Sequence, residues 1–378
     1  MSNTPSNKLS HSDSEAAKSL DEMVTRWIRP EVLDINAYYV PDPGDMVKLD
    51  AMENPYSWPE SLNASWLEKL TTVAINRYPD PAANDVKSAI RSAFSVPDTM
   101  DILLGNGSDE IIQMLAMAVA KPDRVVLAPE PSFVMYKMIA LMAGMEYVGV
   151  PLQSDFSLDA DTIINAIQQY NPALVFLAYP NNPTGNLFDT DVIRAILRVS
   201  QGLVIIDEAY QPFAGTSLID WLGQYNNLLI MRTVSKMGMA GLRLGYLLGD
   251  KRWIQQVDKM RLPYNINVLT QLTARLALQN AQAFMQQTQT ICKDREILYQ
   301  EMDKLANIKI YPTFTNFILF RVIKKSSQQV FDYLKQQGIL VKNLGNSPGP
   351  LHNCLRVTIG TPDENARFLA ALKSSLQE

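Results

Sequence analysis

Short apolar runs alternate with longer amphipathic stretches between residues 101 and 249. The apolar runs are mostly continuous, which is typical of strands that are buried on both faces. We expect strands at 101–105, 124–128, 173–180, 203–207, 227–233 and 245–249, and helices at 109–120, 133–143, 159–168 and 189–199. This alternation predicts an α/β fold, in which helices cover a mostly parallel central sheet.

The pattern changes after Lys251. A long helical stretch at 268–305 precedes strands at 316–322 and 355–359, a helix at 327–337 and a last helix from Asp363, which together predict a smaller α+β domain. At the other end, a Ser/Asn-rich tail precedes a helix near 16–27 that stops ahead of Pro30. We therefore expect an N-terminal tail and helix at 1–45 that join the small domain, a large domain at 46–265 and a small domain at 266–378.

Composition narrows the class of protein. At 378 residues the chain exceeds most single cores, and a net charge of −5 gives no reason to expect nucleic acid or a membrane surface as a partner. No apolar run reaches the roughly 18 residues of a membrane helix, and the first residues do not resemble a secretory signal. Cys292 and Cys354 lie too far apart for a disulfide framework, and His11 and His352 are the only histidines, so we expect no metal site and a cytoplasmic protein.

Polar residues gather directly after four of the predicted strands. The strands run into NGSDE, NNPTG, EAY and VSK. Each motif alone reads as an ordinary turn or helix cap, but ligands of open α/β sheets bind beyond the carboxyl ends of the strands. Four such ends together predict a ligand site there.

Pyridoxal phosphate is the cofactor whose chemistry needs this set of residues. A lysine amine must bond to its aldehyde from a partly desolvated position, and Lys236 stands among small and apolar residues in TVSKMGMAGLRLGY. A carboxylate must lie against its pyridine nitrogen, and Asp207 ends a buried strand. Its phosphate needs a helix N-terminus, hydroxyls and an arginine. These groups are supplied by Gly107, Ser108, Asp109, Thr233, Ser235 and Arg243.

At these residues the chain resembles the fold-type I aminotransferases of class I/II, from about Tyr38 onward. The motifs NNPTG, DEAY and a lysine followed seven residues later by an arginine carry the resemblance. KLDAMENPY, RYPDP, GNGSDE, PSFVMY, PYNIN, TNFILF and LRVTIGTPDEN are similar to the histidinol-phosphate aminotransferase branch. The resemblance implies a homodimer, with residues 1–45 at the dimer contact. It also implies exchange of an amino group between histidinol phosphate and 2-oxoglutarate, giving imidazole-acetol phosphate and glutamate.

The resemblance also implies roles for single residues. Lys236 binds the cofactor aldehyde and moves a proton, Asp207 pairs with the pyridinium nitrogen, and Tyr210 acts with them as a catalytic residue. Tyr210 and Asn182 hydrogen-bond the ring oxygen, and Tyr136 stacks on the ring. The phosphate is held by Ser108, Asp109, Thr233, Ser235 and Arg243, with Tyr78 reaching in from the partner subunit. The substrate contacts are Arg356, which grips the α-carboxylate, and Asn182, Tyr39 and Lys342.

Three positions depart from the family pattern. Asp50 and Met52 stand where asparagine is common, and Lys342 stands where many relatives carry an arginine for the substrate phosphate. Lysine neutralises a phosphate but cannot form the planar fork of arginine. Other outcomes on this fold stay open: an aromatic or broad-range aminotransferase, or a decarboxylase of a phosphorylated amino acid. A cofactor-binding regulator is disfavoured, because the residues before KLDAMENP are too few and too acidic for a DNA-reading module.

Overall fold

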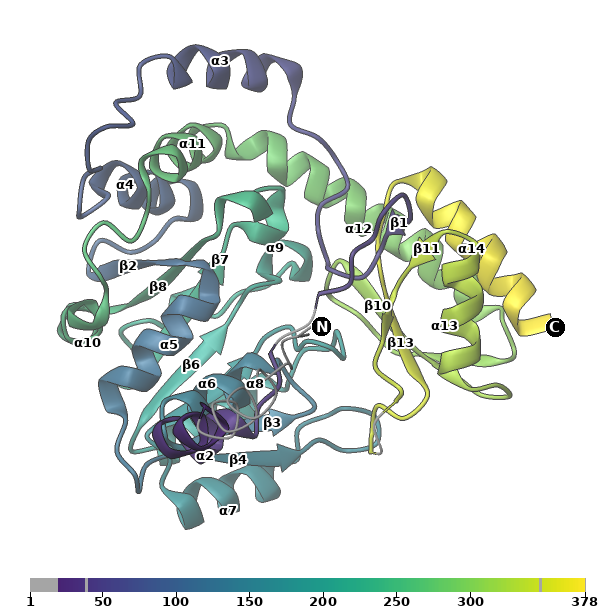
Figure 1. Cartoon of the computed structure of the whole chain (residues 1–378), viewed down its shortest axis with the longest axis horizontal. Coiled ribbons are helices and arrows are strands. Elements are labelled where there is room, and N and C mark those ends of the chain that lie inside the picture. Colours follow the sequence, from purple (N-terminus) through teal and green to yellow (C-terminus); the bar gives the residue numbers. More distant parts are fainter. Residues whose placement is uncertain (1–19, 38–39, 347–348, 378) are drawn as a thin grey trace, which may run out of the picture.

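A computed structural model describes residues 20–37, 40–346 and 349–377, which form two lobes (Figure 1). The larger lobe is built on a seven-stranded sheet in the order β2-β8-β7-β6-β5-β3-β4. Its strands are β2 (Met100–Asn106), β3 (Val125–Glu130), β4 (Glu146–Pro151), β5 (Leu174–Ala178), β6 (Leu203–Asp207), β7 (Leu228–Thr233) and β8 (Leu244–Asp250). Neighbouring strands are parallel from β7 to β4, and β8 lies antiparallel to both β7 and β2. The predicted mostly parallel sheet is confirmed.

Side chains from both faces of the sheet are buried, as continuous apolar runs predict. In β6, Leu203 and Ile205 face one hydrophobic cluster, whereas Val204 and Ile206 face the other. The first cluster lies under α5 (Gly107–Val119), α6 (Met135–Met142) and α10 (Lys251–Val257). The second lies under α4 (Asn84–Phe94), α7 (Ala160–Tyr170), α8 (Thr190–Val199) and α11 (Val268–Gln279). Helices therefore cover both faces.

One strand of this sheet, β4, was not predicted from the sequence pattern. β4 is an edge strand with the sequence EYVGVP, and only Val150 in it is buried. Edge strands need not be apolar on both sides, and a glycine and a proline weaken the strand signal further. The six predicted strands were the ones that bury both faces.

The smaller lobe contains an antiparallel sheet in the order β12-β13-β10-β9. Its strands are β9 (Ile308–Ile310), β10 (Phe317–Val322), β12 (Lys342–Asn343) and β13 (Cys354–Thr358). α13 (Ser327–Gln336) and α14 (Pro362–Gln377) pack on it, and α12 (Ala281–Asp303) runs into it from the larger lobe (Figure 1). β1 (Val47–Lys48) pairs with β11 (Ile339–Leu340), which ties the N-terminal segment to this lobe.

The helical stretch at 268–305 consists of two helices with different neighbours. α11 packs on α4 and on α3 (Glu60–Leu70) in the larger lobe, whereas α12 contacts β9, β10 and α14 in the smaller one. The change of lobe along the chain thus falls within α12, and the predicted domain boundary at 265/266 stays a prediction. The remaining short helices are α9 (Gln211–Ala214), η1 (Ile219–Trp221), η2 (Ser235–Met237), η3 (Ala240–Leu242) and η4 (Asp258–Met260).

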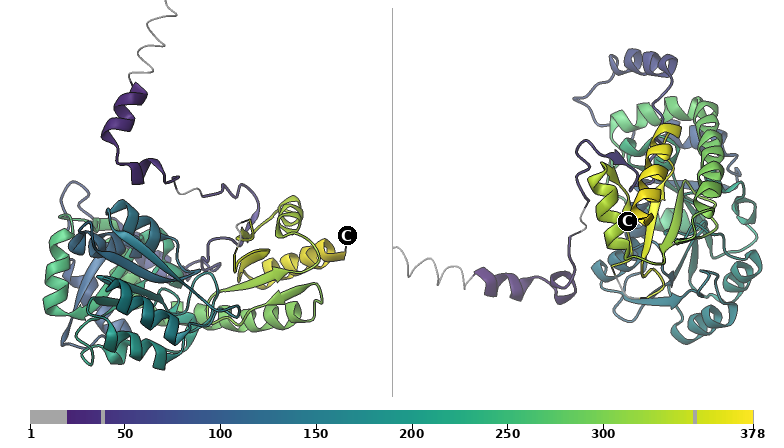
Figure 2. Two further views of the ribbon diagram at one scale, coloured as in Figure 1. Left: turned by 90° about the horizontal axis from the view of Figure 1, so that it is seen from below. Right: turned by 90° about the vertical axis from the view of Figure 1, so that its right-hand side faces the viewer.

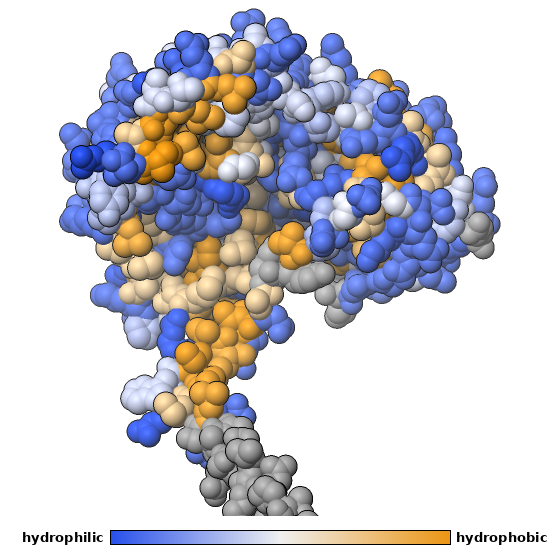
Figure 3. Space-filling model, turned by 45° about the horizontal axis from the view of Figure 1, so that its top comes forward, coloured by the Kyte–Doolittle hydropathy of each residue, from blue (hydrophilic) through white to orange (hydrophobic). Residues whose placement is uncertain are grey.

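The N-terminal helices project from the larger lobe (Figure 2). They touch it at α6, where Arg29 donates a hydrogen bond to the carbonyl of Met142. Residues 20–27 are helical and stop ahead of Pro30, as expected, and α2 (Pro30–Leu33) follows; residues 16–19 of the predicted helix lie outside the described residues. Apolar side chains are exposed along this segment, with Trp27 72% exposed, and they form the orange stalk in Figure 3. In the described part of the chain, no helix is both long and apolar enough to cross a membrane.

Candidate active site

A cavity opens beyond the carboxyl ends of β5, β6 and β7. Nine predicted site residues line it: Ser108, Asp109, Asn182, Asp207, Tyr210, Thr233, Ser235, Lys236 and Arg243. The other lining residues are Met52, Phe133, Ala178, Pro180 and Ala209, and the empty space is about 580 Å³. The structure therefore brings together, from four strand ends, the residues that the motifs singled out.

Lys236 lies in the short helix η2 that directly follows β7, and Gly238 ends this helix with a φ of +96°. Its Nζ donates to the carbonyl of Ala51 at 3.3 Å and lies 5.7 Å from the centre of the Tyr210 ring. Desolvation and, after it, the positive charge of Arg356 lower the pKa of Lys236 to about 8. A substantial fraction of this amine is therefore neutral near pH 8, which is what nucleophilic chemistry on an aldehyde requires.

Asp207 is buried at the end of β6. Its Oδ2 accepts a hydrogen bond from the Tyr136 hydroxyl at 2.6 Å, and its Oδ1 accepts one from the Ala209 amide at 3.0 Å. Burial raises the pKa of Asp207 to about 6, while these two hydrogen bonds act in the opposite direction. A buried carboxylate of this kind is stabilised as an anion when a cation such as a pyridinium lies against it.

Tyr136 occupies a different place from the expected one. It is fully buried and stacks on Phe176, with ring centres 4.7 Å apart and planes at 10°, and it is not part of the cavity wall. Phe133 lines the cavity instead and meets Tyr136 edge-on at 5.5 Å. The expectation that Tyr136 stacks on the cofactor ring is therefore wrong. Tyr136 lies in the first turn of α6 and points into the core, whereas Phe133 lies in the loop before that helix.

The predicted phosphate site lies where α5 begins, directly after β2. Gly107 has a φ of +79°, and a Cβ added there would lie 2.6 Å from Nη2 of Arg243. A Cβ on Gly245 would lie 2.7 Å from the amide nitrogen of Ser108. These two glycines allow the helix N-terminus and Arg243 to meet, and Arg243 contacts the Asp109 carboxylate at 3.1 Å. With the Thr233 and Ser235 hydroxyls beside it, this arrangement suits a phosphate.

Arg356 joins the smaller lobe to the cavity. It is buried on β13, and its Nη1 donates to Oδ1 of Asn182 at 2.6 Å. Its Nη2 donates to the main-chain carbonyl of Asp50 at 3.0 Å. The Asp50 side chain lies 3.5 Å from Lys48 instead. Because Arg356 uses the carbonyl of residue 50 and not its side chain, the departure from asparagine at that position leaves this contact intact.

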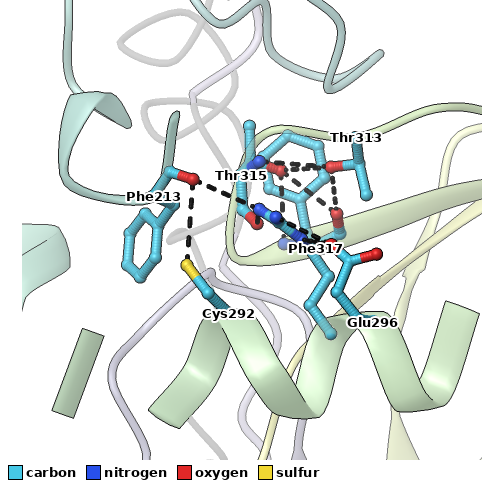
Figure 4. Close-up of polar contacts among 7 residues, drawn as sticks. Phe213, Cys292, Glu296, Thr313, Thr315 and Phe317 are labelled. Atoms are coloured by element: carbon cyan, nitrogen blue, oxygen red, sulfur yellow. Dashed lines mark hydrogen bonds and ion pairs between the residues drawn. The ribbon is translucent and has the colours of Figure 1, made fainter. Parts of the chain in front are cut away.

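The segment that follows Tyr210 is tied to the smaller lobe by Arg295, a residue that the motifs did not single out. Tyr210 precedes α9 and packs edge-on against Phe317 of β10 at 5.2 Å. Arg295 of α12 donates from Nη1 to the carbonyls of Phe213 and Thr315, at 3.3 and 3.0 Å (Figure 4). Arg295 is buried on a face of α12 that otherwise buries four apolar residues and Thr288. The sequence signal that could have identified Arg295 is its position as a charged residue on the apolar face of a helix.

Besides Tyr136 and Arg356, three other predicted site residues are not among those that line the cavity. Tyr78 is 80% exposed and stacks on Tyr264, with ring centres 4.4 Å apart. Lys342 lies on β12 in register with Arg356. Tyr39 lies outside the described residues.

Taken together, the residues present fit pyridoxal phosphate. One cavity combines an amine of lowered pKa, a buried carboxylate and an anion site, and a guanidinium lies at its border. A pyridine ring with an aldehyde and a phosphate needs these groups.

Comparison with known proteins gives the same picture. The family described as "Aminotransferase class I and II" matches residues 44–372. Histidinol-phosphate aminotransferase 2 of Nitrosococcus oceani is 50% identical over 353 residues, which cover 93% of this chain and 98% of that protein. The crystal structure of the histidinol-phosphate aminotransferase from Clostridium acetobutylicum superimposes with a TM-score of 0.81 at 25% identity, over 88% of this chain and 99% of the other. The enzyme from Sinorhizobium meliloti in complex with pyridoxal-5'-phosphate has the same fold, with a TM-score of 0.82 at 22% identity over 93% and 98% of the chains.

Proposed function

This chain belongs to the class I and II aminotransferase family, and from that premise we propose that it transfers the amino group of histidinol phosphate to 2-oxoglutarate. It is a pyridoxal-phosphate-dependent transaminase, so its substrates are an amino donor and a 2-oxo acid. When bound, the cofactor supplies an electron sink for the negative charge that develops at the substrate's α-carbon. The products are imidazole-acetol phosphate and glutamate, which places the reaction in histidine biosynthesis.

Each residue of the cavity has a task in this reaction. Lys236 holds the aldehyde and, once its amine is released and neutral, removes the proton from the α-carbon. The Asp207 carboxylate keeps the pyridine nitrogen protonated, and Tyr136 holds that carboxylate in place. Phe133 supplies the aromatic face on which the ring stacks, and Tyr210 and Asn182 reach the ring oxygen. These assignments are supported by the cavity that Lys236, Asp207, Phe133, Tyr210 and Asn182 share, and for Tyr136 by its hydrogen bond to Asp207.

The two ends of the substrates are held by different groups in this proposal. Arg356 binds the α-carboxylate of glutamate through a planar fork and is already oriented by Asn182. Lys342, in register with Arg356 on the neighbouring strand, neutralises the phosphate of histidinol phosphate. Tyr39 completes the substrate contacts.

The active protein in this proposal is a cytoplasmic homodimer. Tyr78 and Tyr264 form an exposed aromatic pair, and Ile75 and Leu262 near them are also exposed. An isologous contact would cover such a patch on both subunits, and Tyr78 would then reach the partner's cofactor phosphate. Residues 1–45 take part in the same contact. The free thiols of Cys292 and Cys354 agree with a reducing compartment.

The observation that carries the proposal is the link from Arg356 to Asn182 at the edge of the cavity that holds Lys236. It leads to a test in which the reaction of the holoenzyme with glutamate and its reaction with histidinol phosphate are measured separately. Arg356→Ala should slow the reaction of glutamate by about a hundredfold, since a bidentate charged contact is lost. Histidinol phosphate has no α-carboxylate and should lose far less. Arg367→Ala, on the exposed side of α14, is the matched control.

The measurement is the absorbance change of the cofactor on mixing the holoenzyme with each amino donor. Equal losses for both donors would show that Arg356 supports the fold and not the carboxylate. If the unmodified enzyme forms no glutamate from histidinol phosphate and 2-oxoglutarate, the proposed substrate is wrong. Release of carbon dioxide from a phosphorylated amino acid would instead support the decarboxylase alternative.

A further inference from the structure

A left-handed backbone turn lies on the wall of the active-site cavity. Met52, which lines the cavity, has a φ of +54°. Glycine adopts such a φ freely and asparagine does so fairly often, but a methionine rarely does. A strained conformation of this kind persists only where the surrounding structure enforces it, and such positions gather at functional sites.

Two buried side chains of the smaller lobe hold this turn. The amide nitrogen of Met52 donates to Oγ1 of Thr358 at 3.0 Å, and Nδ2 of Asn316 donates to the carbonyl of Met52 at 3.0 Å. Thr358 ends β13, and Asn316 directly precedes the neighbouring strand β10. The Met52 side chain also packs against the hydrophobic cluster of this lobe. The turn is therefore fixed to the smaller lobe, although Lys236 belongs to the larger one.

The turn brings a main-chain carbonyl to the Lys236 amine. The carbonyl of Ala51 accepts a hydrogen bond from Nζ of Lys236 at 3.3 Å. This carbonyl belongs to the rigid peptide unit that joins Ala51 to Met52, so its direction depends on the φ of Met52. With an ordinary negative φ at residue 52, the peptide would be rotated and its oxygen would point away from Nζ.

We propose that Met52 is a positioning residue, whose left-handed turn aims the Ala51 carbonyl at the Lys236 amine and holds this amine in place while it is not bonded to the cofactor aldehyde. The inference rests on the proposed role of Lys236 in removing a proton from the α-carbon. A lysine side chain has many rotamers, and an acceptor fixed in the cavity restricts them. The amine then stays within reach of the proton that it must take.

The test begins with the apoenzyme. Met52→Val places a β-branched residue in the turn, where a positive φ is strongly disfavoured, so the peptide should rotate and release the amine. At about pH 9, capture of pyridoxal should slow roughly tenfold, because the amine samples more rotamers. Ser95→Val is the matched control, since Ser95 has a φ of +52° at the end of α4 and does not line the cavity. It should lower the urea midpoint of unfolding and leave capture unchanged.

The holoenzyme gives a second readout, with glutamate as the donor. The rate at saturating glutamate should fall about tenfold in Met52→Val, and the apparent Kd should stay within about twofold. Arg356 bonds the carbonyl of Asp50, which belongs to the preceding peptide unit. Deuterium at the α-carbon of glutamate should slow the variant more than the unmodified enzyme, because proton removal has become the slower step. A loss of packing alone would not change this isotope effect.

Two further variants separate the turn from the methionine side chain and from general loss of folding. Met52→Asn favours the turn, so it should raise the urea midpoint and lose far less rate than Met52→Val. Thr358→Val removes the acceptor of the Met52 amide without changing residue 52, and it should reproduce the slow capture.

Capture of pyridoxal at the unmodified rate in both Met52→Val and Thr358→Val would overturn the inference. Equal losses in Met52→Asn and Met52→Val would also overturn it, because they would assign the effect to the methionine side chain. Capture needs no amino donor. Failure of the unmodified enzyme to use glutamate or histidinol phosphate would therefore refute the proposed function and would leave the result of the capture test standing.

Discussion

Lys236 must be without its ammonium proton before it can bond to an aldehyde. The ordinary pKa of 10.5 would leave almost none of the amine neutral at pH 7, whereas a pKa of about 8 leaves roughly a tenth. Because the neutral form is the one above the pKa, cofactor capture by the apoenzyme should accelerate as pH rises. We expect the rate to increase about tenfold per pH unit below 8 and to level off above it.

Stopped-flow absorbance after mixing apoenzyme with pyridoxal phosphate measures this rate. Pyridoxal without its phosphate is the control, because it removes the ionisation of the phosphate from the profile, and its midpoint should be the same. A midpoint near 10.5 would show that the surroundings of Lys236 do not lower its pKa.

At the scale of single residues, motif reasoning found side chains that follow strand ends. Lys236 and Arg243 could be predicted because they are the only charged residues in TVSKMGMAGLRLGY, and Asp207 could be predicted because it ends a buried apolar run. The choice between Phe133 and Tyr136 could not be made in advance. The motif PSFVMY offers two aromatics three residues apart, and only the exact start of α6 decides which one faces the core.

At the scale of secondary-structure elements, the helix α12 holds the two sides of the cavity together. α12 buries Phe284, Thr288, Ile291, Arg295, Leu298 and Met302 at spacings of three and four residues. Arg295 thus lies on the buried side and bonds the carbonyls of Phe213 and Thr315 (Figure 4). One carbonyl belongs to α9, which follows Tyr210, and the other to the segment before Phe317.

Arg295→Met should therefore leave two carbonyls buried without this donor, at a cost of about 1–3 kcal/mol for each. We expect a lower urea midpoint of unfolding and a shifted cofactor absorbance, since Tyr210 loses part of its support. Arg295→Lys should recover part of both effects, and Lys293→Met, on the exposed face of α12, should show neither. An unchanged midpoint in Arg295→Met would mean that water replaces the guanidinium at no cost.

Strands could be predicted from the sequence where both of their faces are buried. The strand at 203–207 was placed to the residue, because all five of its positions are buried. α3 and α4 were not predicted, and α3 buries only Leu62. A helix with so little burial within its own chain carries a weak apolar pattern.

The proposed dimer can be tested on the whole molecule with two inactive variants. If Tyr78 acts on the partner's site, Tyr78→Ala and Lys236→Ala subunits complement each other in a hybrid, which has one complete site and one that lacks both residues. Random exchange in equal amounts makes about half of the dimers hybrid, so roughly a quarter of the unmodified activity should return. If Tyr78 serves its own chain, mixing should restore nothing.

This comparison needs two controls. Tyr78→Ala alone must be clearly impaired, and subunit exchange must be shown independently, for example by mass spectrometry of isotope-labelled protein. Mixing either variant with itself should leave the activity at its starting level.

The antiparallel strand β8 has a consequence for synthesis of the protein on the ribosome. It inserts between β2 and β7, so the phosphate site joins Asp109 to Arg243, which are 134 residues apart. At about 5–20 residues per second, translation needs roughly 7–27 s to cover that distance. During this interval β2 has no partner strand, and the nascent chain cannot hold the cofactor by its phosphate. Cofactor binding must therefore wait until at least the first 243 of the 378 residues have been made.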